Sequence, residues 1–149
     1  MAQGSKRTRA CAVCVSRAQL LCVQLRDPST RIAHLFPPGG AVEPGETAAD
    51  AAVRETVEET GYLVRVQARA PVVAHYPYTW NGQPFDVTTY FFAAELIDPE
   101  APARLVRDAN YVEAARWVAL SDVPRALGFN RDILAAVLTL LPEAGDQNR

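Results

Sequence analysis

Three glutamates on neighbouring turns of one segment are the residues in this chain that most clearly predict chemistry. Glu55, Glu58 and Glu59 lie three and four positions apart in the stretch GETAADAAVRETVEETGY, residues 45–62. On a helix this spacing places the three side chains together, about 5 to 6 Å apart at the base. Repulsion between two such carboxylates is below about 1 kcal/mol in water but roughly 3 kcal/mol at an effective dielectric of about 20. In a cleft, the cluster would therefore be costly without a cation.

A solvated acidic helix face is the plain alternative, because most glutamate-rich faces are of that kind. Such faces normally place a basic residue four positions from each acid. Here only Glu58 has one, Arg54. Oxygen ligands carrying this much negative charge suit Mg²⁺ or Mn²⁺ rather than zinc. The cluster therefore predicts a magnesium site in which Mn²⁺ can substitute.

The loop FPPGGAVEPGE, directly ahead of this segment, offers further oxygen atoms and a partner for the arginine. A backbone carbonyl of Gly39 or Gly40 can complete an oxygen site, because glycine allows close approach of the chain. Arg54 can bridge to Glu46, and such an ion pair would hold the acidic side chains in position. Together these residues are typical of a built metal site.

A helix over residues 47–60 is the element that must carry the acids. Thr47, with Asp50 three residues later, forms a capping-box arrangement, and Gly61 ends the helix. At about 100° per residue, an apolar arc faces the protein and the acidic residues lie on the other side. We expect the packing side to comprise Ala49, Ala52, Val53, Thr56, Val57 and Thr60.

Strands and one further long helix surround this element in the predicted fold. Apolar runs and turn signals predict strands at 10–16, 20–25 and 113–120, and a hairpin over 72–96 around Asn81-Gly82. Residues 101–112 are predicted to be loop, Ser121 to cap a short helical turn up to Leu127, and Asn130 to cap a helix ending before Pro142. The apolar stripe expected to pack on the sheet is Ile133, Leu134, Val137, Leu138 and Leu141. The predicted fold class is α/β of the α+β type, with a mixed β-sheet sandwiched between helices.

The length of 149 residues matches one domain, and 49% hydrophobic residues indicate a globular one. We expect that domain to span residues 9–142, between a flexible basic tail over 1–8 and a frayed end over 143–149. A formal net charge of −2 gives no general attraction to nucleic acid or anionic lipid. The apolar run near the N-terminus is too short for a signal peptide or a membrane span. The sequence therefore predicts a soluble, cytoplasmic protein with neither membrane nor specific nucleic-acid binding.

Three cysteines, an odd number, favour free thiols in a reducing compartment. Cys11 and Cys14 form a single CxxC, a spacing also found at zinc and redox sites. On a strand, however, residues three apart point to opposite faces, so the two sulfur atoms would diverge. We interpret these cysteines as structural.

Aromatic residues gather at the tip of the predicted hairpin, in the stretch HYPYTWNGQPF, residues 75–85. Rings of this kind can stack a nucleobase without sequence demand. The alternative is that they cover the sheet or form a dimer contact. The candidates for substrate binding are Tyr76, Tyr78, Trp80 and Phe85.

Residues 40–62 resemble the Nudix box, whose pattern is G, five residues, E, seven residues, then R-E-U-x-E-E-x-G-U, where U is a bulky apolar residue. The positions that match are Gly40, Glu46, Arg54, Glu55, Glu58, Glu59, Gly61 and Tyr62. Thr56, at the first U position, is the one departure. The resemblance implies Mg²⁺-dependent hydrolysis of the diphosphate linkage in a nucleoside diphosphate linked to a group X. Its implied partner is a small nucleotide or another diphosphate compound, and homodimers are common in the family.

The resemblance also implies roles for the residues of the box. Glu55, Glu58 and Glu59 would ligate the metal together with the carbonyl of Gly40, and Arg54 would orient Glu55. Glu55 is the first choice for the base that activates water. The family alternatively places this base on a loop before the last strand, where Asp108 and Glu113 are the candidates, Glu113 being preferred as base or extra ligand.

Two other functions remain open for a chain with this box. One is a catalytically silent domain that senses nucleotide or serves as a scaffold. Such regulators usually lose acids or gain a DNA-binding domain, and this chain keeps the acids. The other is isomerisation of isopentenyl diphosphate on a related fold. That reaction needs carbon acid-base groups, which the small set of cysteines does not obviously supply.

Overall fold

The computed structural model describes residues 4–100 and 112–142. Its strands belong to one eight-stranded mixed sheet. The strands are β1 (Ser5–Ser16), β2 (Gln19–Arg26), β3 (Ala33–Phe36), β4 (Gly39–Ala41), β5 (Val64–Val66), β6 (Val72–Trp80), β7 (Gln83–Leu96) and β8 (Val112–Ala119). The helices are α1 (Ala48–Thr60), α2 (Val123–Leu127) and α3 (Arg131–Leu140), and a 3-10 turn, η1, spans Leu120–Asp122.

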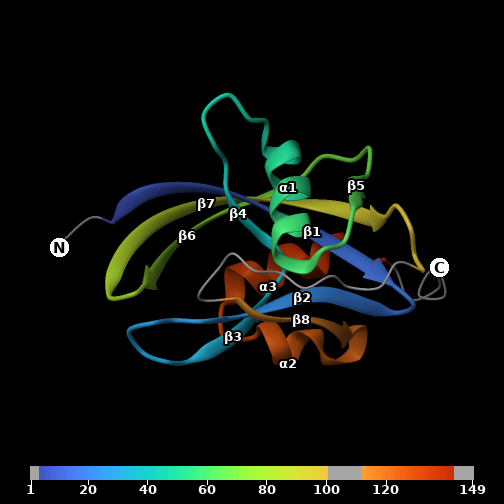
Figure 1. Cartoon of the computed structure of the whole chain (residues 1–149). Helices are drawn as coiled ribbons and strands as arrows, with labels where there is room; N and C mark the ends of the chain where they lie inside the picture. Colours follow the sequence, from blue (N-terminus) through green and yellow to red (C-terminus); the bar gives the residue numbers. More distant parts are fainter. Residues whose placement is uncertain (1–3, 101–111, 143–149) are drawn as a thin grey trace.

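Strand β1 joins two halves of the sheet. Over residues 5–14 it runs parallel to β7, which also pairs with β5 and β6. At Val15 and Ser16 it turns into an antiparallel pair with β2, which carries β3 and β8. Figure 1 shows the two halves diverging from the β1–β2 turn.

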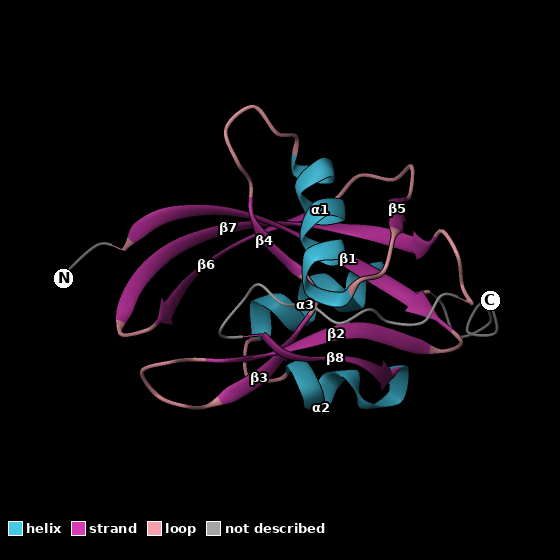
Figure 2. Cartoon of the chain, viewed as in Figure 1, coloured by secondary structure: helices cyan, strands magenta, loops and turns pink. Residues whose placement is uncertain are grey.

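Helices cover both sides of this sheet (Figure 2). Helix α1 packs on β1, β4 and β5, whereas α3 packs on β6 and β7 and α2 on β3 and β8. The predicted class, a mixed sheet sandwiched between helices, is confirmed. None of the described helices is long and apolar enough to cross a membrane.

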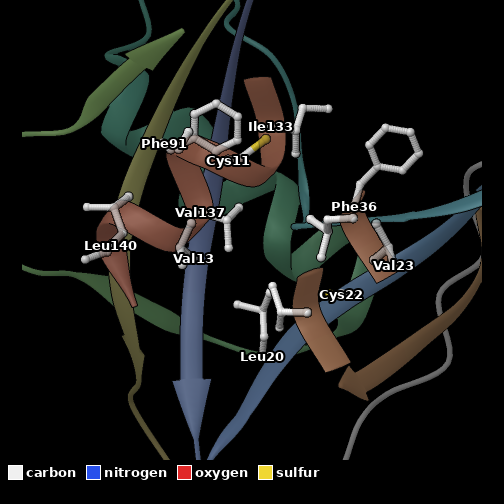
Figure 3. Packing of buried hydrophobic residues seen from close by; sticks show 14 of the residues in the cluster. Cys11, Val13, Leu20, Cys22, Val23, Phe36, Phe91, Ile133, Val137 and Leu140 are labelled. Carbon is white, nitrogen blue, oxygen red and sulfur yellow. The ribbon is translucent and has the colours of Figure 1, made fainter. Parts of the chain in front are cut away.

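Buried apolar side chains from both halves meet α3 in the main core (Figure 3). Cys11 and Cys22 belong to this core, whereas Cys14 lies in a second cluster together with Tyr62. The expected divergence of Cys11 and Cys14 is therefore confirmed, and all three cysteines are free and buried. Burial raises the pKa of each thiol to about 12.

Helix α1 begins and ends as its local signals predict. The Thr47 hydroxyl oxygen accepts a hydrogen bond from the backbone N–H of Asp50 at 3.1 Å. Gly61 adopts the left-handed conformation, with φ of 77°, at the C-terminal end. The predicted packing side is incomplete, however, because Ala51 and Glu59 are also buried. Thr56, the departure from the box pattern, is fully buried and its hydroxyl donates to the carbonyl of Ala52 at 2.7 Å.

The predicted flexible tail is wrong for Ser5–Thr8. These residues form the first part of β1 and pair in parallel with residues 85–88 of β7. Their polar side chains hide this strand from a search for apolar runs, because backbone pairing with a long neighbour does not require apolar side chains. The hairpin of β6 and β7 is confirmed, with φ of 50° at Asn81 and 75° at Gly82 in its turn.

The C-terminal helices agree with the sequence in part. The Asn130 side chain caps α3 by accepting from the N–H groups of Asp132 and Ile133, both at 3.0 Å. Leu138, assigned to the packing stripe, is instead 44% exposed. Ser121 lies inside η1, and α2 begins without a side-chain cap. The buried residues of α3 are Ile133, Ala136, Val137 and Leu140. The loop over 101–112, apart from Val112, and the end over 143–149 lie outside the described residues.

Candidate functional site

The acidic cluster of α1 faces the short strand β4, which places backbone close to the carboxylates. A Cβ atom on Gly40 would lie 2.6 Å from both carboxylate oxygens of Glu55. No larger residue fits there without moving Glu55. β4 is held in this place by pairing with β1, where Gly40 lies opposite Ala10. The backbone of β4 and the Glu55 carboxylate are therefore in close contact.

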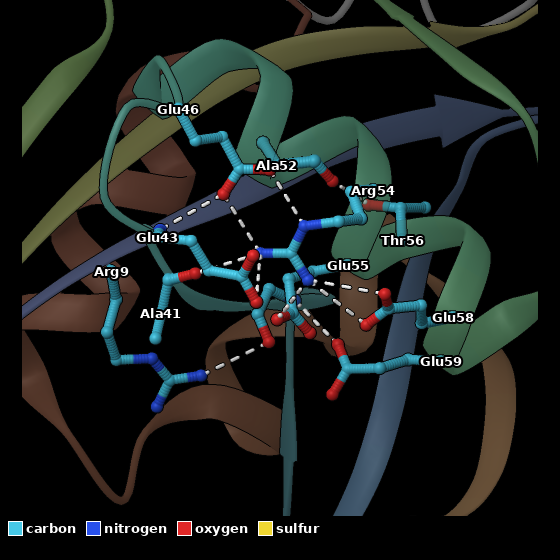
Figure 4. Close-up of polar contacts among 11 residues, drawn as sticks. Arg9, Ala41, Glu43, Glu46, Ala52, Arg54, Glu55, Thr56, Glu58 and Glu59 are labelled. Carbon is cyan, nitrogen blue, oxygen red and sulfur yellow. Dashed lines mark hydrogen bonds and ion pairs between the residues drawn. The ribbon is translucent and has the colours of Figure 1, made fainter. Parts of the chain in front are cut away.

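Arg54 is the centre of the polar network around the acidic cluster (Figure 4). Its Nε donates to Glu46 Oε2 at 2.7 Å and its Nη2 to Glu46 Oε1 at 3.0 Å. This two-point pairing is the bridge expected from the sequence, and it fixes the plane of the guanidinium. The same Nη2 donates to the backbone carbonyl of Ala41 at 3.0 Å. Arg54 therefore joins α1 to the preceding loop.

The remaining donor of Arg54 reaches two acids of the cluster. Its Nη1 donates to Glu55 Oε1 at 3.0 Å and to the Glu58 carboxylate at 3.2 and 3.3 Å. As placed, the described residues include no group of three acidic, histidine or cysteine side chains arranged around one metal position. The side chain of Glu58 is 50% exposed, so its carboxylate has room to move from Arg54 to a cation.

Glu59 is the buried member of the cluster, with 5% of its surface exposed. Its Oε1 accepts a hydrogen bond from the Gly39 N–H at 2.7 Å. Burial raises the pKa of Glu59 to about 8, against the opposing effect of the Gly39 bond. Burial likewise raises the pKa of Glu55, although Arg54 opposes it. Two desolvated carboxylates on adjacent turns favour a nearby cation, so the donor set fits a divalent metal.

A hollow of about 310 Å³ leads away from Glu55 between the two halves of the sheet. Three of the four candidate aromatic side chains, Tyr78, Trp80 and Phe85, line it. The fourth, Tyr76, is buried in the main core and its hydroxyl pairs with Thr89 Oγ1 at 2.8 Å. Tyr76 is therefore not placed to stack a ligand: it shares the face of β6 that carries Tyr78 and Trp80, but lies farther along the strand, where the core covers it.

Two sequence candidates for the base cannot be placed beside the cluster. Asp108 lies outside the described residues. Glu113 belongs to β8 by its backbone, but its side chain lies outside the described part of the structure. The other candidates, Glu55, Glu58, Glu59 and Gly40, are brought together with their supporting residues Glu46, Arg54 and Gly39.

Sequence reasoning missed Arg7 and Arg9, which also line the hollow. The sequence alone assigns them to a basic tail or to its border with the domain. Their spacing of two, in a run that continues as RACAV, is the alternation of a strand and could have revealed them.

Comparisons with known proteins agree with this geometry. The model of the NUDIX domain matches residues 5–137. A Bacillus subtilis protein provisionally named 8-oxo-dGTP diphosphatase is 32% identical over 94 residues, which cover 63% of this chain and only 56% of that protein. An RNA pyrophosphohydrolase of Erythrobacter litoralis is 29% identical over 157 aligned positions, covering 93% of this chain and 96% of that one.

A solved structure shows the same fold. A NUDIX hydrolase from Nitrosomonas europaea aligns with a TM-score of 0.64 at 22% identity, covering 97% of this chain and 92% of the other. At 22% identity, the similarity to this structure shows the fold alone. The match to the NUDIX domain model covers residues 5–137, which is most of the sequence, and therefore shows the family. Three acids of the Nudix pattern, Glu46, Glu55 and Glu58, are also the ones that pair with Arg54. The chain belongs to the Nudix hydrolase family.

Proposed function

We propose that this protein hydrolyses the phosphoanhydride linkage of a nucleoside diphosphate derivative, using Mg²⁺ bound at the acidic cluster of α1. The observation that carries the proposal is the placement of Glu55 both in the cluster and in the wall of the aromatic hollow. The same hollow is therefore lined by an oxygen ligand and by aromatic rings. The named activities of the two relatives, a diphosphatase and a pyrophosphohydrolase, support the same class of reaction.

Glu55, Glu58, Glu59 and the carbonyl of Gly40 are the groups that would hold the metal. When bound, Mg²⁺ supplies positive charge that neutralises phosphate oxygens and lowers the pKa of water. Arg54 holds Glu55 in place through its bond to Oε1, and it is itself fixed by Glu46. The Gly39 N–H fixes one oxygen of Glu59, which leaves the other oxygen as a ligand.

The reaction is a displacement at phosphorus. The oxygen of a water molecule forms a bond to one phosphorus of the linkage, and the bond from that phosphorus to the bridging oxygen breaks. The bridging oxygen leaves with the second phosphate, so the two products together gain one water. Glu55 accepts a proton from the attacking water in this scheme, with Glu113 as the alternative base. Comparing the pH-rate profiles of Glu55→Gln and Glu113→Gln identifies the base. The variant that lacks the base loses the rise in rate that follows ionisation of that base as the pH increases.

The aromatic residues Tyr78 and Trp80 provide rings on which a nucleobase can stack, whereas the Phe85 ring contacts the guanidinium of Arg7. Stacking on such rings tolerates different bases, which is consistent with relatives named for different nucleotide substrates. The hollow therefore supports a nucleotide as the substrate class.

The proposal is tested by incubating the protein with nucleoside diphosphate derivatives and Mg²⁺ or Mn²⁺, and identifying products by mass. We expect cleavage at a phosphoanhydride, and a loss of at least about 100-fold in turnover for Glu58→Gln and Glu59→Gln. Glu95→Gln is the control, because Glu95 is exposed on β7 and pairs with Arg65. Nucleotide binding without any cleavage would favour a silent sensing domain, and full turnover in a folded Glu58→Gln protein would refute the assignment.

A further inference from the structure

The hollow beside the acidic cluster has a basic wall to which the proposed reaction assigns no role. Arg7 and Arg9 lie two residues apart on β1 and line the hollow together with Glu55. Alternate residues of a strand share one face and lie about 7 Å apart. Pairing with β7, opposite Val87 and Thr89, fixes both positions. The wall therefore presents two guanidinium groups in a row.

Arg9 is the inner member of this pair. Its Nη2 donates to the carbonyl of Gly39 at 3.3 Å, and the N–H of the same glycine donates to Glu59. Arg9 is thus joined through one residue to the buried acid of the cluster. Its positive charge therefore lies beside the acidic cluster at which we propose that the linkage is cleaved.

Arg7 is the outer member and has a different environment. Its guanidinium carbon lies 4.6 Å from the centre of the Phe85 ring. Among the described residues, no carboxylate forms an ion pair with Arg7. A contact between a cation and a ring forms no conventional hydrogen bond, so the N–H groups of the guanidinium stay available to an anion. Phe85 therefore holds Arg7 in the hollow without satisfying its donors.

We propose that Arg7 binds an anionic group of the substrate that lies beyond the linkage cleaved at the acidic cluster. The preferred substrates are then nucleoside triphosphates or longer polyphosphates, rather than nucleoside diphosphate sugars. This inference rests on the proposed function and names its substrate class. Arg7 is a specificity-determining residue in this account, because it contacts the substrate away from the reacting phosphorus.

The physical reason is the difference between a charged and a neutral group at this position. A phosphate accepts two hydrogen bonds from the planar fork of an arginine, and such charge-assisted bonds are stronger than neutral ones. A sugar offers only neutral hydroxyl groups at this position. A hydrogen bond between Arg7 and a hydroxyl group replaces hydrogen bonds to water and adds little free energy of binding. The outer arginine therefore favours a further phosphate over a sugar by about tenfold or more.

Matched substrate pairs test this inference. The values of kcat/KM with Mg²⁺ are compared for ATP and ADP-glucose, GTP and GDP-mannose, and UTP and UDP-glucose. The variants are Arg7→Gln, Arg7→Lys and the control Lys6→Gln. Lys6 is the adjacent positive residue of β1, it does not line the hollow, and its loss changes the net charge equally. Unfolding midpoints without ligand show whether each variant is folded.

We expect the wild type to favour a triphosphate over the diphosphate sugar of the same base by at least about tenfold. Arg7→Gln should lower that ratio by about tenfold, Arg7→Lys by less, and Lys6→Gln should keep it. Preference for the sugars, or an unchanged ratio in folded Arg7→Gln, would overturn the inference while leaving the proposed hydrolysis intact. Cleavage of no diphosphate compound at all would instead overturn the proposed function and the inference with it.

A second readout does not depend on cleavage. In EDTA, a nucleoside triphosphate should raise the unfolding midpoint of the wild type and of Lys6→Gln by a larger amount than that of Arg7→Gln. Equal shifts in all three proteins, including no shift in any, would contradict a contact between Arg7 and the nucleotide.

Discussion

Glu59→Gln should alter how the stability of the metal-free protein depends on pH. The side chain is 5% exposed, and its Oε1 accepts from the Gly39 N–H. A glutamine at this position keeps the size and can keep this bond through its amide oxygen, but it has no proton to lose. The substitution therefore removes the titration of one buried acid and little else.

The magnitude follows from the pKa. Burial raises the pKa of Glu59 from 4.5 to about 8 in the folded protein. Between these pH values the folded chain holds a proton that the unfolded chain has lost, so the free energy of unfolding falls as the pH rises. At 1.36 kcal/mol per pH unit, the displacement from 4.5 to about 8 amounts to at most about 5 kcal/mol. The ionised acid is thus a destabilising feature above neutral pH when no cation is bound.

Urea denaturation in EDTA between pH 5 and 8.5 measures this effect. The free energy of unfolding of Glu59→Gln, relative to wild type, should increase steadily with pH and level off near pH 8. Glu95→Gln removes an equal charge from an exposed surface pair and serves as the control. If the free energy of unfolding of Glu59→Gln changed with pH in the same way as that of the wild type does, the claim that burial raises the pKa of Glu59 would be refuted.

Three further predictions concern the surroundings of the cluster. Gly40→Ala should lower kcat/KM by at least about tenfold in a folded protein, because its Cβ would meet the Glu55 carboxylate; unchanged kinetics would show that Glu55 is free to move. Arg54→Lys keeps the charge but loses the two-point pairing with Glu46, so kcat should fall by at least about tenfold; a wild-type kcat in this variant would contradict the positioning role. The three cysteines should react with a thiol reagent only after denaturation, since burial raises their pKa values to about 12; rapid labelling of the native protein at pH 7 would contradict this.

The features that local sequence signals control were predictable. Helix α1 has its cap, its acids and its terminal glycine within one short stretch, and the β6–β7 hairpin has Asn81-Gly82 at its turn. The metal-binding proposal needed only this helix and the glycines before it. These parts of the fold depend on residues that are neighbours in the chain.

The features that depend on distant pairing were not predictable from one sequence. Ser5–Thr8 became a strand because β7, some 80 residues later, lies beside them. Glu59 became buried because β4 passes over its side chain and supplies the Gly39 N–H. Helical periodicity assigned Glu59 to the exposed side together with the other acids. It gives only the angular position of a side chain around the helix axis and does not show which other elements pack against that side. The role of Arg7 could be inferred only once these contacts were visible.

Direct measurement of Mn²⁺ binding tests the central claim, that these acids share a divalent cation. Mn²⁺ is titrated into the metal-free protein, and free Mn²⁺ is measured by its electron paramagnetic resonance signal. We expect saturable binding in the wild type and in the control variant Glu43→Gln, since the side chain of Glu43 is 66% exposed. Glu58→Gln should weaken that binding by at least about tenfold, and Mg²⁺ should displace the ion. An absence of binding in the wild type, or equal affinity in Glu58→Gln and Glu43→Gln, would contradict the account.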